Sequence, residues 1–212
     1  KFIHLNINFT KSMTSIITGD IINSKKSSPK KWLSALKSIL NNYGNSPLTW
    51  EIYRGDSFQL EVSPKLALEA CILIKATIKQ FENIDVRLAI GIGEKEYHSE
   101  NITESNGSAF VNSGECFEAL KKTTLAIKTP FEAFDTQINI MLELAQLTIN
   151  SWTSTTATLV KTALEHPDLN QKQIAETLEK TQGNISQGLK RAGFDEVFKL
   201  LQYFKNQMQS LC

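Results

Sequence analysis

The chain has 212 residues, of which 41% are hydrophobic and 21% are charged, a composition typical of a folded globular protein and not of a disordered one. This length allows one or two domains with a sizeable core. The formal net charge is only +1, so any affinity for nucleic acid must come from a local basic patch and not from a general excess of Lys and Arg.

The cysteines and the apolar runs exclude further classes of protein. Cys71, Cys116 and Cys212 form neither a Cys-x-x-Cys motif nor a Cys/His cluster, which argues against a structural zinc and favours a reducing, cytoplasmic location. We expect Cys71 and Cys116 to be buried as small apolar side chains and not to act as nucleophiles. No apolar run approaches the roughly 18 residues that span a bilayer, so no membrane partner is expected.

The first predicted elements follow Met13, which we interpret as the natural start of the protein, with residues 1–12 as an upstream extension. Residues 15–22 form a short apolar run that predicts a central strand. Ser28 and Pro29 then combine an N-cap with a proline at the first helical position, and the apolar spacing behind them predicts a helix.

A β-hairpin is predicted next. Residues 50–53 and 58–62 alternate apolar and polar side chains, as strands with one buried face do. Gly55 and Asp56 lie between them and are typical turn residues. The turn of this hairpin therefore carries a carboxylate.

A second helix is predicted from Ser63 and Pro64, and its apolar spacing indicates an amphipathic helix that reaches Phe81. Residues 86–92 predict a fourth strand, and residues 108–125 predict a further helix. The order β-α-β-β-α-β is that of the split βαβ arrangement, so we expect a ferredoxin-like α+β fold in this part of the chain.

The strand pattern disappears after residue 128. Residues 131–152 have the spacing of a long helix, residues 151–158 form a polar, Thr-rich break, and helical patterns recur to the end of the chain. We therefore predict an α+β domain over residues 13–128 and an all-α domain over residues 129–212.

Two carboxylates are expected to meet in the first domain. In a β-α-β-β-α-β sheet the first strand lies antiparallel to the third, so its end, at Asp20, abuts the hairpin turn that holds Asp56. Two carboxylates that lie close together repel each other, so a cation such as Mg²⁺ is expected between them. The alternative is that both Gly-Asp pairs are present only for their turn geometry.

The loop beyond the first strand adds polar and basic groups. We interpret Ser24, Lys25 and Lys26 as candidates for binding nucleotide phosphates, and the alternative is that the two lysines belong to a solvated loop. The pair Gly91 and Gly93 lacks the third glycine and the following helix of a dinucleotide-binding fingerprint, so we assign no ligand to it.

Four short motifs resemble the core of class III nucleotide cyclases. These motifs are Gly19-Asp20-Ile21, Arg54-Gly55-Asp56-Ser57-Phe58, Val86 to Gly93, and Phe110 to Gly114. The resemblance implies a palm-like domain in which Asp20 and Asp56 bind Mg²⁺ and Asn112 contacts the nucleotide. Where the cyclase helix carries an arginine for the transition state, this chain has Glu115 and Cys116, so binding is expected ahead of catalysis.

The C-terminal part contains a pattern typical of helix-turn-helix regulators. Asn170 and Thr181 are the predicted N-caps of two short helices. The inward side chains of this pair are expected to be Ile174, Ala175, Leu178, Ile185 and Leu189. The alternative is an ordinary pair of helices in a bundle, with its polar residues facing water.

The outward face of the second of these helices carries side chains suited to DNA. Gln and Asn can pair with adenine edges, and Lys and Arg can bind guanine or phosphate. The predicted DNA-contacting residues are Gln182, Asn184, Ser186, Gln187, Lys190 and Arg191. The fusion of this helix pair to the cyclase-like part resembles the bacterial SatD-like proteins, and the resemblance covers residues 13–204.

The last predicted helix carries an apolar seam that can either pack within the chain or form a homodimer. The residues of this seam are Val197, Leu200, Leu201, Phe204 and Met208. These features predict a DNA-binding transcriptional regulator with a nucleotide-sensing N-terminal domain. The alternatives are an active Mg²⁺-dependent nucleotidyl cyclase or related phosphoryl-transfer enzyme, and an interaction protein in which both sites are vestigial.

Overall fold

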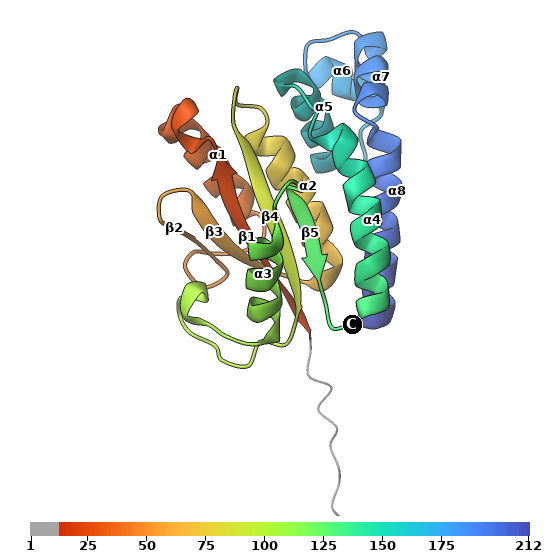
Figure 1. Ribbon diagram of the computed structural model, residues 1–212. Coiled ribbons are helices and arrows are strands. Elements are labelled where there is room, and N and C mark those ends of the chain that lie inside the picture. Colours follow the sequence, from red (N-terminus) through yellow and green to blue (C-terminus); the bar gives the residue numbers. More distant parts are fainter. Residues whose placement is uncertain (1–12) are drawn as a thin grey trace, which may run out of the picture.

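The computed structural model describes residues 13–212, so the interpretation of residues 1–12 as an upstream extension lies outside the described part of the chain. That part has a mixed α/β fold with one five-stranded sheet and eight α-helices (Figure 1). The strands are β1 (Thr14–Ile22), β2 (Trp50–Tyr53), β3 (Ser57–Val62), β4 (Asp85–Gly93) and β5 (Leu125–Lys128). The helices are α1 (Pro29–Asn41), α2 (Ala67–Ile78), α3 (Ser108–Ala119), α4 (Glu132–Ile149), α5 (Ser154–Glu165), α6 (Gln171–Thr177), α7 (Gln182–Arg191) and α8 (Phe194–Leu211).

The sheet has the strand order β2-β3-β1-β4-β5. β1 is antiparallel to both β3 and β4, β2 is antiparallel to β3, and β5 is parallel to β4. The predicted hairpin and the antiparallel pairing of the first strand with the third are therefore confirmed. Because Asp20 is the register partner of Ser57, the end of β1 lies beside the turn between β2 and β3.

Several boundaries differ from the prediction. α2 begins at Ala67 and ends at Ile78, inside the predicted range from Ser63 to Phe81. The sequence predicts a helix within residues 108–125, but α3 ends at Ala119 and residues 125–128 form β5. This strand is too short for an alternating pattern to reveal, and it exists because β4 offers it a parallel partner. The predicted Thr-rich break is also shorter, since the Thr153 side chain caps α5, which begins at Ser154.

Helices cover both faces of the sheet (Figure 1). On β1, Ile17 and Ile21 belong to the core beneath α1 and α2, whereas Ile16 packs on the side of α3. Thr18 also faces α3, because its hydroxyl lies 2.6 Å from that of Ser113. Side chains alternate along a strand, so the next residue on the α3 face of β1 is Asp20.

α2 is buried on almost every side. Of its twelve residues, all but Glu69 are buried. The sequence predicts an amphipathic helix here, and that prediction is wrong, because α2 packs against the sheet on one side and against α1, α5 and α8 on others (Figure 1). A helix enclosed by neighbours on every side needs no polar face.

One hydrophobic core extends from the sheet into the C-terminal helices. The core that contains Ile17 and Ile90 also contains Phe204. The apolar seam predicted for α8 packs within the chain, since Val197, Leu201, Phe204 and Met208 are all buried. No helix in residues 13–212 combines the length and the apolarity that crossing a membrane requires.

A buried ion pair joins α2 to the sheet and to α4. Lys75 is fully buried, and its Nζ donates to Asp85 Oδ1 at 3.0 Å and to Thr124 Oγ1 at 2.9 Å. Lys79 lies 3.3 Å from the same carboxylate and donates to the backbone carbonyl of Asn150, just after α4. Burial lowers the pKa of Lys75, and the charge of Asp85 opposes this shift.

Candidate functional site

Four polar residues form a row across the sheet at the end of β1. The strand register pairs Tyr53 with Ser57, Ser57 with Asp20, and Asp20 with Arg87, so the row crosses β2, β3, β1 and β4. Directly opposite residues of antiparallel strands point to the same face of a sheet, here the face of α3. The fold thus joins Asp20 to three residues that the sequence analysis did not assign to the site.

Arg87 neutralises Asp20 directly. Its Nη2 donates to Asp20 Oδ2 at 2.5 Å. The guanidinium carbon lies 5.2 Å from the centre of the Phe117 ring of α3, which is a cation–π contact. The sequence signal for Arg87 is an arginine inside the otherwise apolar run of residues 86–92, where an unpaired charge would be costly.

Asp56 lies beside the end of β1, as predicted. Its backbone carbonyl accepts a hydrogen bond from the N–H of Ile21 at 3.1 Å. Its Oδ2 accepts a hydrogen bond from Ser24 Oγ at 2.7 Å. The hairpin turn is therefore tied to both the end of β1 and the short 3-10 helix η1 (Ser24–Lys26) that follows.

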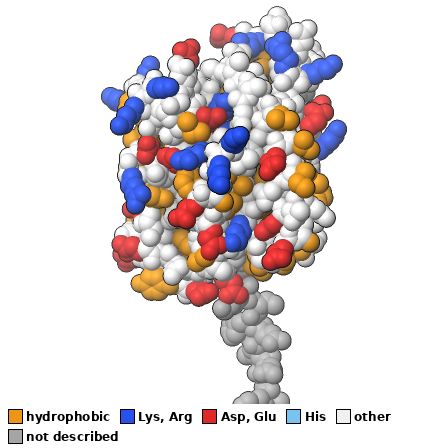
Figure 2. All heavy atoms as spheres, viewed as in Figure 1, with side chains coloured by type: hydrophobic (Ala, Val, Ile, Leu, Met, Phe, Trp, Pro, Cys, Tyr) orange, Lys and Arg blue, Asp and Glu red, His pale blue; other side chains and the backbone are white. Residues whose placement is uncertain are grey.

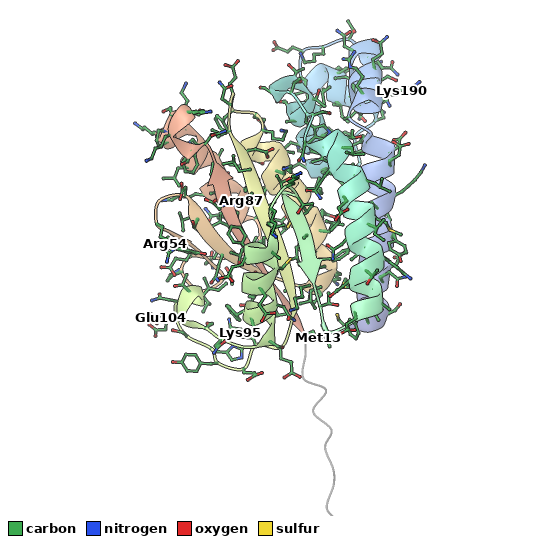
Figure 3. The ribbon with its side chains drawn as sticks, in the orientation of Figure 1. Met13, Arg54, Arg87, Lys95, Glu104 and Lys190 are labelled. Carbon is green, nitrogen blue, oxygen red and sulfur yellow. The ribbon has the colours of Figure 1, made fainter. Side chains whose placement is uncertain are left out.

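These contacts surround a pocket of about 560 Å³. The charged and hydroxyl side chains that line it are Asp20, Ser24, Lys25, Lys26, Asp56 and Arg87. Three cationic side chains face two carboxylates, so the pocket has an excess of positive charge. Figure 3 shows Arg87 over the middle strands of the sheet and Arg54 at the hairpin turn. The structure thus brings together every site residue predicted for this half of the chain except Asn112.

Asn112 lies away from this pocket. It belongs to α3, and its Nδ2 donates to the carbonyl oxygen of Ile92 at 2.8 Å. Ile92 pairs with Ser15, five residues before Asp20 on β1, which corresponds to about 16 Å along the strand. The fold uses the Asn112 amide to join α3 to β4, so this geometry does not support the contact with the nucleotide that the cyclase resemblance implies.

Tyr53 adds a phenol at the β2 end of the row, with Ser57 of β3 between it and Asp20. Burial raises the pKa of Tyr53; the charge of Arg54 lowers it, and the charge of Asp20 adds to the rise. Tyr53 is therefore a neutral hydroxyl at physiological pH, able to donate a hydrogen bond at the edge of the site.

Cys116 is buried in a small apolar cluster, at the edge of a pocket that Lys128 and Asp135 also line. Cys116 packs with Ala89 and Leu120, and burial raises the pKa of its thiol to about 12. Cys71 is also buried, and burial raises its pKa as well, so the predicted burial of both cysteines is confirmed. At the place where a cyclase would carry an arginine, the chain has a small buried side chain without charge.

Two of the side chains that line the pocket are carboxylates, the type of protein ligand that a magnesium ion takes. Mg²⁺ is usually held by one or two carboxylates together with waters and phosphate oxygens. Asp20 and Asp56 supply two carboxylates to one pocket, and the hydrogen bonds described above use only the Oδ2 atom of each. The neighbouring lysines supply the positive charge that phosphate oxygens require.

α6 and α7 form a helix pair at one end of the molecule (Figure 1). Asn170 and Gln173 form a capping box at the start of α6, and Thr181 Oγ1 accepts a hydrogen bond from the backbone N–H of Asn184 in α7. Both predicted N-caps are therefore confirmed. The side chains buried between the pair and α5 include Ile174, Ala175, Ile185 and Leu189.

The outer face of α7 is polar and exposed. All six predicted DNA-contacting residues are exposed there: Gln182, Asn184, Ser186, Gln187, Lys190 and Arg191. Residues 170–191 carry four basic and two acidic side chains, and Figure 2 shows basic side chains at this end of the molecule. Glu179 takes a left-handed φ of 52° in the turn between the helices, a position where glycine is usual.

Comparison with known proteins gives a family and no activity. No curated protein and no solved structure matches the chain significantly. The sequence profile of the SatD family matches residues 14–210, which include both the pocket and the helix pair. Because this match spans nearly all of the described residues, the chain belongs to the SatD family.

Proposed function

We propose that this SatD-family protein is a DNA-binding transcriptional regulator of the bacterial cytoplasm that senses a nucleotide together with Mg²⁺. In this proposal residues 13–128 form a ferredoxin-like, cyclase-like sensing domain, and residues 129–212 form a helix-turn-helix domain. The observation that carries the proposal is the pocket in which Asp20 and Asp56 lie among three cationic side chains.

Each part of the pocket has a role in nucleotide binding. Asp20 and Asp56 hold the metal ion, while Lys25 and Lys26 bind phosphate oxygens. Arg87 can pair either with Asp20, as it does here, or with a bound phosphate. Asp20 therefore has a cationic partner both without the ligand, in Arg87, and with it, in the metal ion, which limits the cost of partly burying this carboxylate.

The exposed face of α7 is proposed to contact DNA. Its first turns offer Gln182 and Asn184 to base edges, and its last turn offers Lys190 and Arg191 to phosphates. A route for coupling exists because α2 packs on both the sheet and α5, and α5 in turn packs on α7. The coupling itself is part of the proposal.

Isothermal titration calorimetry with the common ribonucleotides, with and without Mg²⁺, tests the sensing function. We expect Mg²⁺-dependent binding, weakened about tenfold or more by Asp20→Ala or Asp56→Ala. Glu132→Ala removes an acidic side chain at the start of α4, outside the pocket, and is expected to leave the affinity unchanged. An absence of Mg²⁺-dependent binding for every nucleotide would refute the proposal.

The same pocket supports one alternative, a Mg²⁺-dependent nucleotidyl cyclase or related phosphoryl-transfer enzyme. Arg87 favours it, because a cation beside the carboxylates can neutralise charge that develops on phosphate. The buried, uncharged Cys116, at the position where the cyclase helix carries an arginine, argues against it. Turnover of ATP or GTP that is lost in Asp20→Asn would establish the enzyme. If the protein bound neither nucleotides nor DNA, the remaining alternative would be an interaction protein.

A further inference from the structure

An apolar ridge runs along the outer side of α4. Ile140, Leu144 and Leu147 are 57%, 64% and 76% exposed, and their spacing places them on one side of the helix. Of the eight large hydrophobic side chains that are exposed in residues 13–212, four belong to α4. Figure 2 shows hydrophobic side chains gathered on this side of the molecule. We call these three residues the α4 ridge.

An apolar groove lies beside the α4 ridge, between α4 and α8. It has a volume of about 650 Å³, and its walls include Met141 and Ala145 of α4 and Leu200 and Tyr203 of α8. Leu144 belongs to the α4 ridge and also lines the groove. A protruding apolar surface and a hollow apolar surface are therefore adjacent on one face.

Two opposite charges flank this face. An α-helix turns by about 100° per residue, so Glu143 lies on one side of Leu144, while Met141 and Ala145 lie on the other side, toward the groove. On α8 both Glu196 and Lys199 line the groove and are exposed. The turn of the helix places Glu196 beside Leu200 and Tyr203 in the groove wall and Lys199 at its outer border. Across the surface the order is therefore Glu143, the α4 ridge, the groove and Lys199.

We propose that a second copy of this chain docks on this face to form a two-fold symmetric dimer. A two-fold axis between the α4 ridge and the groove places each ridge in the groove of the other copy. The same rotation sets Glu143 against the partner's Lys199, outside the groove wall that holds Glu196, so the face is complementary to itself in shape and in this one charge pair. This dimer does not depend on the proposed function. It uses the partly exposed edge of the α8 seam at Leu200, whereas Leu201, Phe204 and Met208 stay buried within the chain.

Multi-angle light scattering over a range of concentrations tests the dimer. We expect a dimer for the unaltered chain and a monomer for Leu144→Glu/Leu147→Glu. The dissociation constant should rise about 100-fold or more, because each substitution enters the interface twice. Leu48→Glu, at a leucine 54% exposed outside this face, should leave the dimer intact. An unaltered chain that stays monomeric at about 100 μM would overturn the proposal.

A charge exchange tests the two-fold pairing itself. Glu143→Lys and Lys199→Glu should each weaken the dimer about fivefold or more, and the double variant should restore it. Both residues are exposed, so far-UV circular dichroism should show an unchanged fold for each variant. A double variant that dimerises no better than the single variants would rule out this pairing.

Discussion

Gly91 lies where α3 crosses β4, and the backbone of α3 occupies the space of a side chain. A Cβ added there would lie 2.1 Å from the backbone nitrogen of Ser113 and 2.3 Å from the carbonyl oxygen of Ala109. Gly91→Ala is therefore expected to lower the free energy of unfolding by about 2–3 kcal/mol, measured by urea denaturation, because α3 must move away from the sheet.

Gly114, in α3 itself, is the matched control for this change. A Cβ added to Gly114 meets no atom within 4 Å. Gly114→Ala should therefore raise the free energy of unfolding by about 0.5–1 kcal/mol, since alanine favours the helix. Equal effects of the two substitutions would contradict the close approach of α3 to β4.

The buried ion pair of Lys75 and Asp85 predicts a pH-dependent loss of stability. Asp85→Asn keeps the shape of the side chain but leaves a fully buried ammonium without its carboxylate, which should cost about 3–5 kcal/mol near neutral pH. The substitution lowers the pKa of Lys75 further below that of the unfolded chain. At a pH between the pKa of Lys75 in the folded variant and its pKa in the unfolded chain, the unfolded state binds more protons than the folded state. The free energy of unfolding of the variant therefore rises with pH in this range.

Urea denaturation from about pH 7 to about pH 10 measures this effect. The loss in free energy of unfolding caused by Asp85→Asn should become smaller as the pH rises, because a neutral Lys75 can be buried without a carboxylate partner. Glu115→Gln, which removes the exposed ion pair with Lys128, should cost less than about 1 kcal/mol. A deficit for Asp85→Asn that is constant over this range would contradict the role of the Lys75 charge.

At the scale of the element, α7 presents its polar side to solvent and buries Ile185 and Leu189 against α5 and α6. Figure 3 shows Lys190 on α7, well away from Arg87 at the sheet. The helix pair is therefore separate from the pocket, and the two surfaces can be altered independently.

DNA binding by α7 predicts a specific dependence on salt. Lys190→Ala/Arg191→Ala should weaken binding to a fluorescent mixed-sequence duplex and reduce the slope of log affinity against log salt by about 2, because two phosphate contacts are lost. Fluorescence anisotropy between about 50 and about 200 mM salt measures this slope.

Lys30→Ala/Lys31→Ala is the control for the loss of charge. It removes two exposed lysines from α1, which is remote from α7 (Figure 1). The affinity and the salt slope should stay unchanged. If both double variants reduced the slope equally, DNA would be attracted by charge anywhere on the surface and not by α7.

At the scale of the whole molecule, one core joins the sheet to the C-terminal helices through the enclosed helix α2. We therefore expect a single cooperative unfolding transition. Tryptophan fluorescence, which reports on Trp32, Trp50 and Trp152, should give the same urea midpoint as far-UV circular dichroism. Two separated transitions would mean that residues 13–128 and 129–212 unfold independently.

Local signals in the sequence were sufficient for the caps of α6 and α7, the hairpin and most strands. The hydroxyl of Ser28, at the N-cap position of α1, makes no capping hydrogen bond. Asn170 and Thr181 cap their helices because a side-chain oxygen reaches backbone groups only two or three residues away. The placement of Asp20 and Asp56 at one pocket also followed from the order of the elements, since connections between neighbouring strands restrict the topology of a sheet.

The tertiary structure alone decided the features that depend on distant partners. Arg87 joins Asp20 because the register of β1 against β4 sets them opposite each other, and the place of Asn112 follows from where α3 crosses the sheet. β5 forms because it pairs with β4, and α2 has no exposed polar face because the sheet and other helices surround it. Interactions between neighbouring residues can be predicted from the local sequence, whereas these contacts form only when remote segments pack together.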